Sequence, residues 1–70
     1  MRNWLKQIRE SSKQTQQEVA DKAKISRPYY TRIEKGEYEI PISTAKRIAA
    51  VLGFDWTLFF EPPADTEKSA

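Results

Sequence analysis

The sequence predicts a small all-α domain, a compact bundle of five helices. Three observations support this prediction. Apolar residues recur at spacings of three and four, capping residues and glycines mark the ends of the resulting segments, and no convincing stretch alternates apolar with polar residues as a strand would. We expect the folded domain to cover residues 1–60 and a polar, disordered tail to cover residues 61–70.

The first two predicted helices cover residues 3–13 and residues 16–23. Apolar residues beginning at Leu5 repeat at helical spacing in the first segment. Thr15 and Glu18 have the spacing of a capping box, in which each side chain binds a backbone amide of the other residue. The second helix therefore starts directly after Thr15.

The third predicted helix covers residues 27–35. Ser26 is a favourable N-cap residue, and Gly36 is suited to the left-handed conformation that ends many helices. Tyr30 and Ile33 are three residues apart, so they lie on one face of the helix and are expected to point into the core.

Two further helices are predicted in the second half of the chain. Ser43 is expected to cap a fourth helix that ends at Gly53, and Asp55 is expected to cap a short fifth helix over residues 56–60. The loop before the fourth helix is expected to be anchored by two isoleucines, Ile40 and Ile42.

The composition argues against several classes of function. The chain has no Cys and no His, so it has no disulfide, no thiolate metal site and no imidazole base. No evident cluster of convergent carboxylates or of phosphate-binding glycines replaces them. We therefore expect neither an enzyme nor a cofactor or metal site. The net charge of +2 is compatible with nucleic acid but does not by itself indicate it.

The location is expected to be cytoplasmic. No apolar run approaches the ~18 residues needed to span a bilayer, and the N-terminal residues lack the long apolar core of a signal peptide. Since 70 residues suffice for one small domain only, control is expected to come from protein concentration, from a partner or from autoregulation.

The spacing of residues from Gln16 onward is typical of a helix-turn-helix. Ala20 is fifth, at the place where two steeply crossed helices need a small residue. The apolar positions eight, ten, fifteen and eighteen are Ala23, Ile25, Tyr30 and Ile33. The second and third helices are therefore predicted to form this motif.

Over roughly residues 4–60 the sequence resembles the Cro/C1-type helix-turn-helix family, the phage-repressor and XRE-like regulators. The matching motifs are Leu5-xx-Ile8-Arg9, Thr15-Gln16-xx-Val19-Ala20, Ile25-Ser26-Arg27, Ile33-Glu34-Lys35-Gly36, Pro41 and Ala45-xx-Ile48-Ala49-xx-Leu52-Gly53. The resemblance implies a bundle of the lambda-repressor-like DNA-binding type and a salt bridge between Arg9 and Glu34. Lys24 departs from the family's usual Gly, at a strain on the order of 1 kcal/mol.

The resemblance also implies that the third helix lies in the major groove of double-stranded DNA while the second crosses the backbone. Arg27 and Arg32 are expected to read guanine, because a guanidinium can donate two hydrogen bonds to O6 and N7, worth ~1–3 kcal/mol. Pro28 can touch a thymine methyl group, Tyr29 can reach a base or a phosphate, and Gln16 can bind a phosphate oxygen. The expected DNA-binding residues are Gln16, Gln17, Ser26, Arg27, Pro28, Tyr29, Thr31, Arg32 and Lys35.

The loop after the third helix carries acidic residues at Glu37 and Glu39, where relatives are often basic. Fewer phosphate contacts are expected there. Each lost contact removes about one unit from the slope of log affinity against log salt, so a shallow salt dependence is predicted.

The residues of the last short helix allow two interpretations. Trp56, Leu58, Phe59 and Phe60 either all close the core, or leave an aromatic patch that pairs with its twin in a symmetric dimer. The family favours dimers, which place two recognition helices ~34 Å apart. We predict a homodimer on a palindromic site, with these four residues at its interface.

The predicted function is a sequence-specific transcriptional regulator, a repressor that binds a palindromic operator. A first alternative is an antitoxin-like or controller protein that binds its own operator together with a protein partner. A second is a protein-interaction module that does not bind DNA, for which the acidic Glu37 and Glu39 give slight support.

Overall fold

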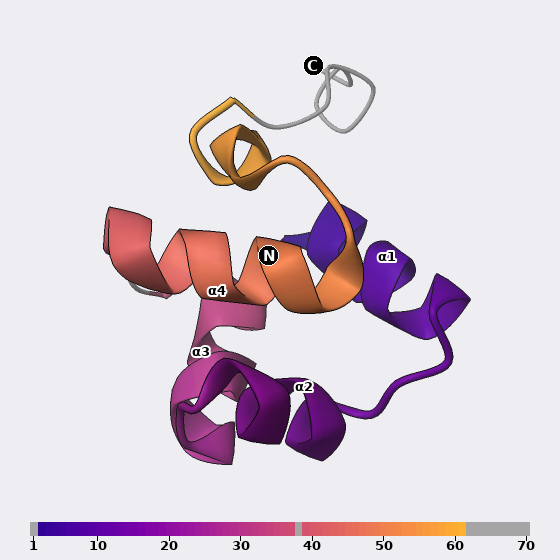
Figure 1. Cartoon of the computed structure of the whole chain (residues 1–70). Coiled ribbons are helices and arrows are strands. Elements are labelled where there is room, and N and C mark those ends of the chain that lie inside the picture. The colour runs from indigo at the N-terminus through magenta and orange to yellow at the C-terminus, as the bar shows by residue number, and fades with distance from the viewer. Residues whose placement is uncertain (1, 38, 62–70) are drawn as a thin grey trace.

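The computed structural model describes residues 2–37 and 39–61, and over these residues the chain is all-helical, without a strand. Four α-helices are followed by a short 3-10 helix (Figure 1). The elements are α1 (Asn3–Ser11), α2 (Gln16–Ala23), α3 (Arg27–Lys35), α4 (Ile42–Leu52) and η1 (Trp56–Phe59). The predicted all-α class is confirmed, whereas the predicted tail lies outside the described residues beyond Glu61.

The prediction of five α-helices was wrong in its last element. The hydrogen bond from the Leu58 amide to the Asp55 carbonyl (3.0 Å) and that from the Phe60 amide to the Thr57 carbonyl (2.9 Å) each span three residues. A run of four residues favours this tighter 3-10 winding over an α-helix. Asp55 caps η1 as predicted, by accepting from the Thr57 amide at 3.0 Å.

Two helix ends also differ from the prediction. The first helix ends at Ser11, because the chain enters the left-handed region at Lys13 (φ 60°). The fourth begins at Ile42 with Pro41 in the N-cap position. Ser43 therefore lies within the first turn of α4, and α4 begins without a side-chain cap.

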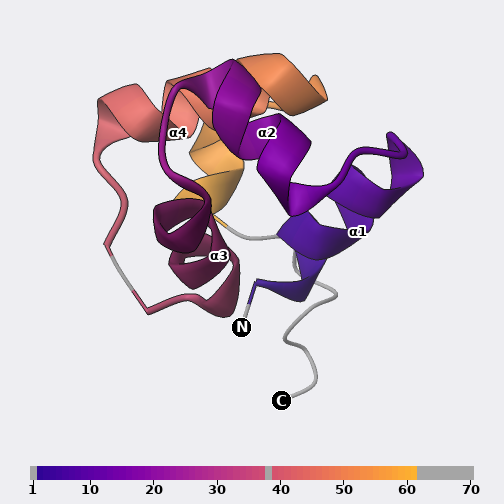
Figure 2. The same ribbon diagram turned by 90° about the horizontal axis from the view of Figure 1, so that it is seen from below.

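The helices pack in two groups about α4. Helices α2 and α3 pack against each other on one side of α4, and η1 packs on the other (Figure 1). Figure 2 shows α1, α2 and α3 from below. Helix α1 contacts α3. Burial agrees with the predicted inward residues, since Ala20, Tyr30 and Ile33 are fully buried.

An aromatic cluster closes the core between α1 and the last turn. The Trp4 ring meets the rings of Phe54 and Phe59 edge-on at centroid distances of 5.5 and 5.2 Å. Of the two loop isoleucines, Ile40 is buried as predicted. Ile42 is 53% exposed, which contradicts its predicted role, because it starts α4 at the end of that helix farthest from α1 (Figure 1).

Residue Arg2, which precedes α1, closes the C-terminal end of α3. Its backbone amide donates to the Glu34 carbonyl at 2.8 Å, and its Nη1 donates to the Ile33 carbonyl at 2.6 Å. The last carbonyls of a helix lack partners within the helix and carry partial negative charge, so a cation is favourable there. The start of the chain thus holds the end of α3.

None of the helices in the described part of the chain is long and apolar enough to cross a membrane.

Candidate nucleic-acid interface

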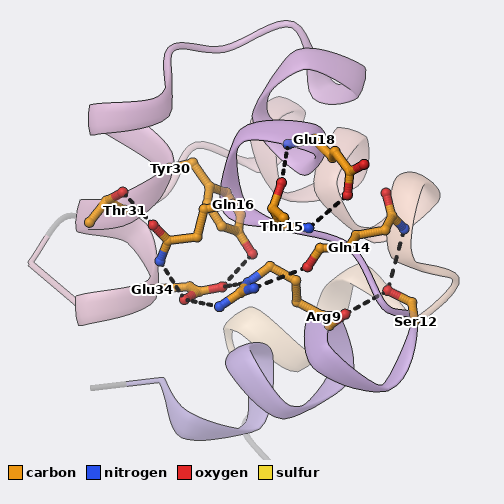
Figure 3. Close-up of polar contacts among 9 residues, drawn as sticks. All are labelled: Arg9, Ser12, Gln14, Thr15, Gln16, Glu18, Tyr30, Thr31 and Glu34. Carbon is orange, nitrogen blue, oxygen red and sulfur yellow. Dashed lines mark hydrogen bonds and ion pairs between the residues drawn. The ribbon is translucent and has the colours of Figure 1, made fainter.

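Local capping interactions set the start of α2. The Thr15 hydroxyl accepts from the Glu18 amide at 3.1 Å, and the Glu18 carboxylate accepts from the Thr15 amide at 2.8 Å (Figure 3). This is the predicted capping box, and α2 starts where the sequence indicated.

The turn between α2 and α3 has the left-handed conformation that the resemblance to the family implied at Lys24. Lys24 adopts the left-handed region (φ 63°, ψ 43°), and the Ile25 amide donates to the Ala20 carbonyl at 3.0 Å. The Ser26 hydroxyl then caps α3 by accepting from the Tyr29 amide at 3.2 Å. Because the turn is short and capped on both sides, the direction of α3 relative to α2 is well determined.

A buried carboxylate joins α1, α2 and α3. Glu34 is 1% exposed, and the predicted salt bridge to Arg9 is present, with 2.6 Å between Arg9 Nε and Glu34 Oε2. The Tyr30 hydroxyl donates to the same oxygen at 2.7 Å. Glu34 Oε1 accepts from Gln16 Nε2 at 3.0 Å and from Arg9 Nη2 at 3.4 Å (Figure 3). Four donors satisfy the carboxylate.

These contacts keep the Glu34 carboxylate ionised. Burial acts to raise the pKa of Glu34, but the hydrogen bonds donated to it, first that of Arg9, outweigh burial and lower the pKa. Burial and the bond to Glu34 raise the pKa of the Tyr30 hydroxyl far above its ordinary value. The hydrogen bond to Glu34 raises the pKa of Arg9.

The outward side of α3 carries a basic hollow. An open depression of about 510 Å³ lies between this face and the start of α2. It is lined by Gln16, Arg27, Pro28, Thr31, Arg32, Lys35 and Glu37. Three of these side chains are cationic and one is acidic, so a polyanion is the ligand class that the charge favours. The structure brings six of the predicted DNA-binding residues together here.

A second hollow lies beside the first, around the start of α2. Its volume is about 480 Å³. The residues that line it are Arg9, Glu10, Lys13, Gln14, Thr15, Gln16, Gln17 and Arg27. Gln16 and Arg27 line both hollows, so the two form one continuous surface. Lys13, two residues before the capping-box residue Thr15, also lines this surface and was not among the predicted residues.

The three predicted DNA-binding residues that do not line the basic hollow also have intramolecular contacts. The exposed Gln17 donates to Asp21 Oδ1 at 2.8 Å, and the Ser26 hydroxyl is engaged in capping α3. Tyr29 is half-buried and packs against the core. The structure places Gln17 at the second hollow, whereas Ser26 and Tyr29 line neither of the two.

The four predicted interface residues of the last turn fall into two groups. Phe59 is buried among the core residues and is thereby removed from the predicted interface, because Trp4 and Phe54 cover its ring. Trp56 and Leu58 are half-buried, and Phe60 is 50% exposed. The Trp56 and Phe60 rings meet edge-on at 6.0 Å.

A capped pair of helices with a tight left-handed turn and a basic outer face on the second helix defines a helix-turn-helix protein. The sequence pattern of the helix-turn-helix family matches residues 5–59. The chain belongs to this family, to its Cro/C1-type, XRE-like and phage-repressor-like DNA-binding members.

Two relatives are informative. An uncharacterized HTH-type transcriptional regulator of Bacillus subtilis (strain 168), YqaF, is 47% identical over 68 residues, which cover 97% of this chain and 90% of the relative. The immunity repressor protein of Bacillus phage phi105 is 41% identical over 49 residues, 70% of this chain but 34% of the repressor. No solved structure matches the chain significantly.

Proposed function

We propose that the protein is a sequence-specific repressor that binds a palindromic operator in double-stranded DNA as a homodimer, with α3 in the major groove. The observation that carries this proposal is the gathering of Arg27, Arg32 and Lys35 on one side of α3, around a hollow that the start of α2 also lines. The major groove, ~12 Å wide, admits a helix of this kind.

The contacts divide into base readers and phosphate binders. Arg27 and Arg32 donate in pairs to guanine O6 and N7, and Pro28 meets a thymine methyl group. Lys35 binds a phosphate oxygen. Gln16 does the same, because its amide nitrogen carries two hydrogens and only one of them is directed to Glu34. Gln17, Ser26 and the Tyr29 hydroxyl are secondary phosphate contacts.

The names of the relatives support regulation by repression. One is an HTH-type transcriptional regulator and the other an immunity repressor protein. Bound DNA would be closed to other proteins, so repression by occlusion requires no catalysis and no cofactor. The protein would act in the cytoplasm, on the nucleoid.

The dimer contact is assigned to the outer part of the last turn. Phe60 and Trp56 offer apolar surface there, and Leu58 borders it. Two-fold pairing through this patch repeats α3 ~34 Å away, which is one turn of DNA.

Selection of bound sequences from random duplex DNA tests the operator. The expected result is an enriched palindrome with guanine in each half-site. Arg27→Ala and Arg32→Ala are each expected to relax the preference at one guanine by ~1–3 kcal/mol. Arg47→Ala removes an exposed arginine of α4 that lines neither hollow and is the matched control. Absence of any enriched sequence would contradict the proposal.

Sedimentation equilibrium tests the homodimer separately. The wild type is expected to be dimeric at micromolar concentration, and Phe60→Glu is expected to be monomeric because it places a charge in the apolar contact. A monomeric wild type would contradict the assigned interface.

A further inference from the structure

We propose that Thr31 determines specificity by accepting a hydrogen bond from the exocyclic amino group of adenine or cytosine. This inference rests on the proposed function, in which α3 lies in the major groove. Its basis is the chain of hydrogen bonds that runs from Glu34 through Gln16 to Thr31 (Figure 3). In this chain each group determines whether the next one donates or accepts a hydrogen bond.

The first link fixes the amide of Gln16. An ionised carboxylate can only accept hydrogen bonds, and Glu34 is held ionised against Arg9. The atom of Gln16 that lies 3.0 Å from Glu34 Oε1 must therefore be the nitrogen, which donates. This assigns the orientation of the amide on chemical grounds.

The second link fixes the hydroxyl hydrogen of Thr31. With its nitrogen directed to Glu34, Gln16 presents its oxygen to Thr31, and an amide oxygen can only accept. Thr31 Oγ1 lies 2.9 Å from Gln16 Oε1 and must donate its single hydrogen there. Only the lone pairs of Thr31 remain for another partner.

The position of Thr31 allows these lone pairs to accept a hydrogen bond from DNA. Thr31 lines the basic hollow on the outward side of α3, together with Arg27 and Arg32. A β-branched side chain is stiff about its first torsion, and here its hydroxyl bonds across to α2. The acceptor is therefore held in place before DNA binds.

An acceptor with no hydrogen to donate discriminates among bases. In the major groove adenine N6 and cytosine N4 are donors, whereas thymine O4 and guanine O6 and N7 are acceptors. The arginines on either side can only donate, so they take guanine. Thr31 can only accept, so it binds a base that donates. The strand that it contacts should carry adenine or cytosine at that position.

Selection from random duplexes with the wild type, Thr31→Ser and Thr31→Val locates the position. Thr31→Ser keeps the hydroxyl and is expected to keep the preference. Thr31→Val is nearly isosteric but has no acceptor, so it is expected to lose the preference at one position per half-site and to keep the others. The proposal is overturned if Thr31→Val relaxes no position, or if Thr31→Ser relaxes the same position to the same extent.

Base analogues in the selected operator then test the direction of the hydrogen bond. Removing the amino group, with purine in place of adenine or 2-pyrimidinone in place of cytosine, should weaken wild-type binding roughly 2- to 10-fold. The same analogue should not weaken binding by Thr31→Val. Where the base is adenine, 7-deazaadenine is the matched control, because it keeps the amino group and lacks the N7 acceptor. Equal losses for wild type and Thr31→Val on the amino-free operator would overturn the proposal.

Gln16→Met adds an outcome that a simple contact does not predict. It removes the acceptor that holds the Thr31 hydrogen, so the freed hydroxyl can donate as well as accept. The preference at the Thr31 position should then broaden to include thymine or guanine, and an unchanged preference would contradict the relay. If the wild type enriches no sequence at all, the proposed function fails instead, and the two failures are thereby distinguished.

Discussion

Replacing Glu34 with glutamine should lower the free energy of unfolding by about 3–5 kcal/mol, the cost of breaking a buried ion pair by removing one partner. Glu34 is 1% exposed and Arg9 is 9% exposed, so water reaches neither charge freely. Four donor atoms lie within 3.4 Å of the carboxylate oxygens. Glutamine offers one oxygen and adds two hydrogens, so Arg9 keeps its charge without a counter-ion.

The expected loss is large for a chain of this size. At ~0.05–0.15 kcal/mol per residue, a 70-residue domain has a total stability of about 4–10 kcal/mol. Urea unfolding followed by circular dichroism at pH 7 measures the loss directly. Glu10→Gln is the matched control, because it removes an exposed carboxylate from α1 and should change stability by less than ~0.5 kcal/mol.

A double-mutant cycle separates the ion pair from packing. Arg9→Met and Glu34→Leu should each be destabilising, and the double variant should be more stable than the sum of the two losses predicts, since neither charge is then left unpaired. A loss below ~1 kcal/mol for Glu34→Gln, or additive effects in the cycle, would refute the view that this pair holds α1 to α3.

Three further predictions concern the turn, the cap and pH. Lys24→Gly should raise the unfolding free energy by ~0.5–1 kcal/mol in urea titrations, because Lys24 has a positive φ, whereas Lys22→Gly, inside α2, should lower it by ~1 kcal/mol. Thr15→Ala should lower the melting temperature, at a cost of ~1 kcal/mol, by removing the capping box. The melting temperature measured against pH should fall at both extremes. On the acid side, the pKa of Glu34 is lower in the folded protein than its value of ~4.3 in the unfolded chain. The ionised carboxylate therefore stabilises the fold above pH ~4.3, and this stability is lost as the pH falls through the folded-state pKa. The raised pKa of Tyr30 gives stability that is present below ~10 and lost as pH rises beyond it, and Tyr30→Phe should abolish the alkaline loss.

The sequence predicted best those elements whose limits are set locally. The bounds of α2 and α3 match the prediction, because the capping groups of Thr15, Ser26 and Gly36 act within three residues of the helix ends. The end of α1 and the start of α4 each differ from the predicted position. No side chain near these ends indicates the left-handed turn at Lys13 or the N-cap position of Pro41.

Contacts between distant parts of the chain were predicted less well. The inward and outward faces of α3 follow from helical spacing, and so the basic residues on its outward side were predicted. The bond from Gln16 to Glu34 joins residues 18 apart and depends on how α2 crosses α3. Phe59 enters the core because Trp4, near the other end of the chain, provides a ring for it to pack on. Helical periodicity carries no information on either contact.

The contact of Arg2 with the end of α3 has a practical consequence for handling this protein. Arg2 lies beside the last turn of the helix that we assign to DNA reading, because its amide and its side chain bind carbonyls of that turn. An affinity tag or fusion partner placed there would crowd that turn and disturb the amide that binds the Glu34 carbonyl. A weak affinity measured with such a fusion would then reflect the tag, so binding should be measured on protein without an N-terminal extension.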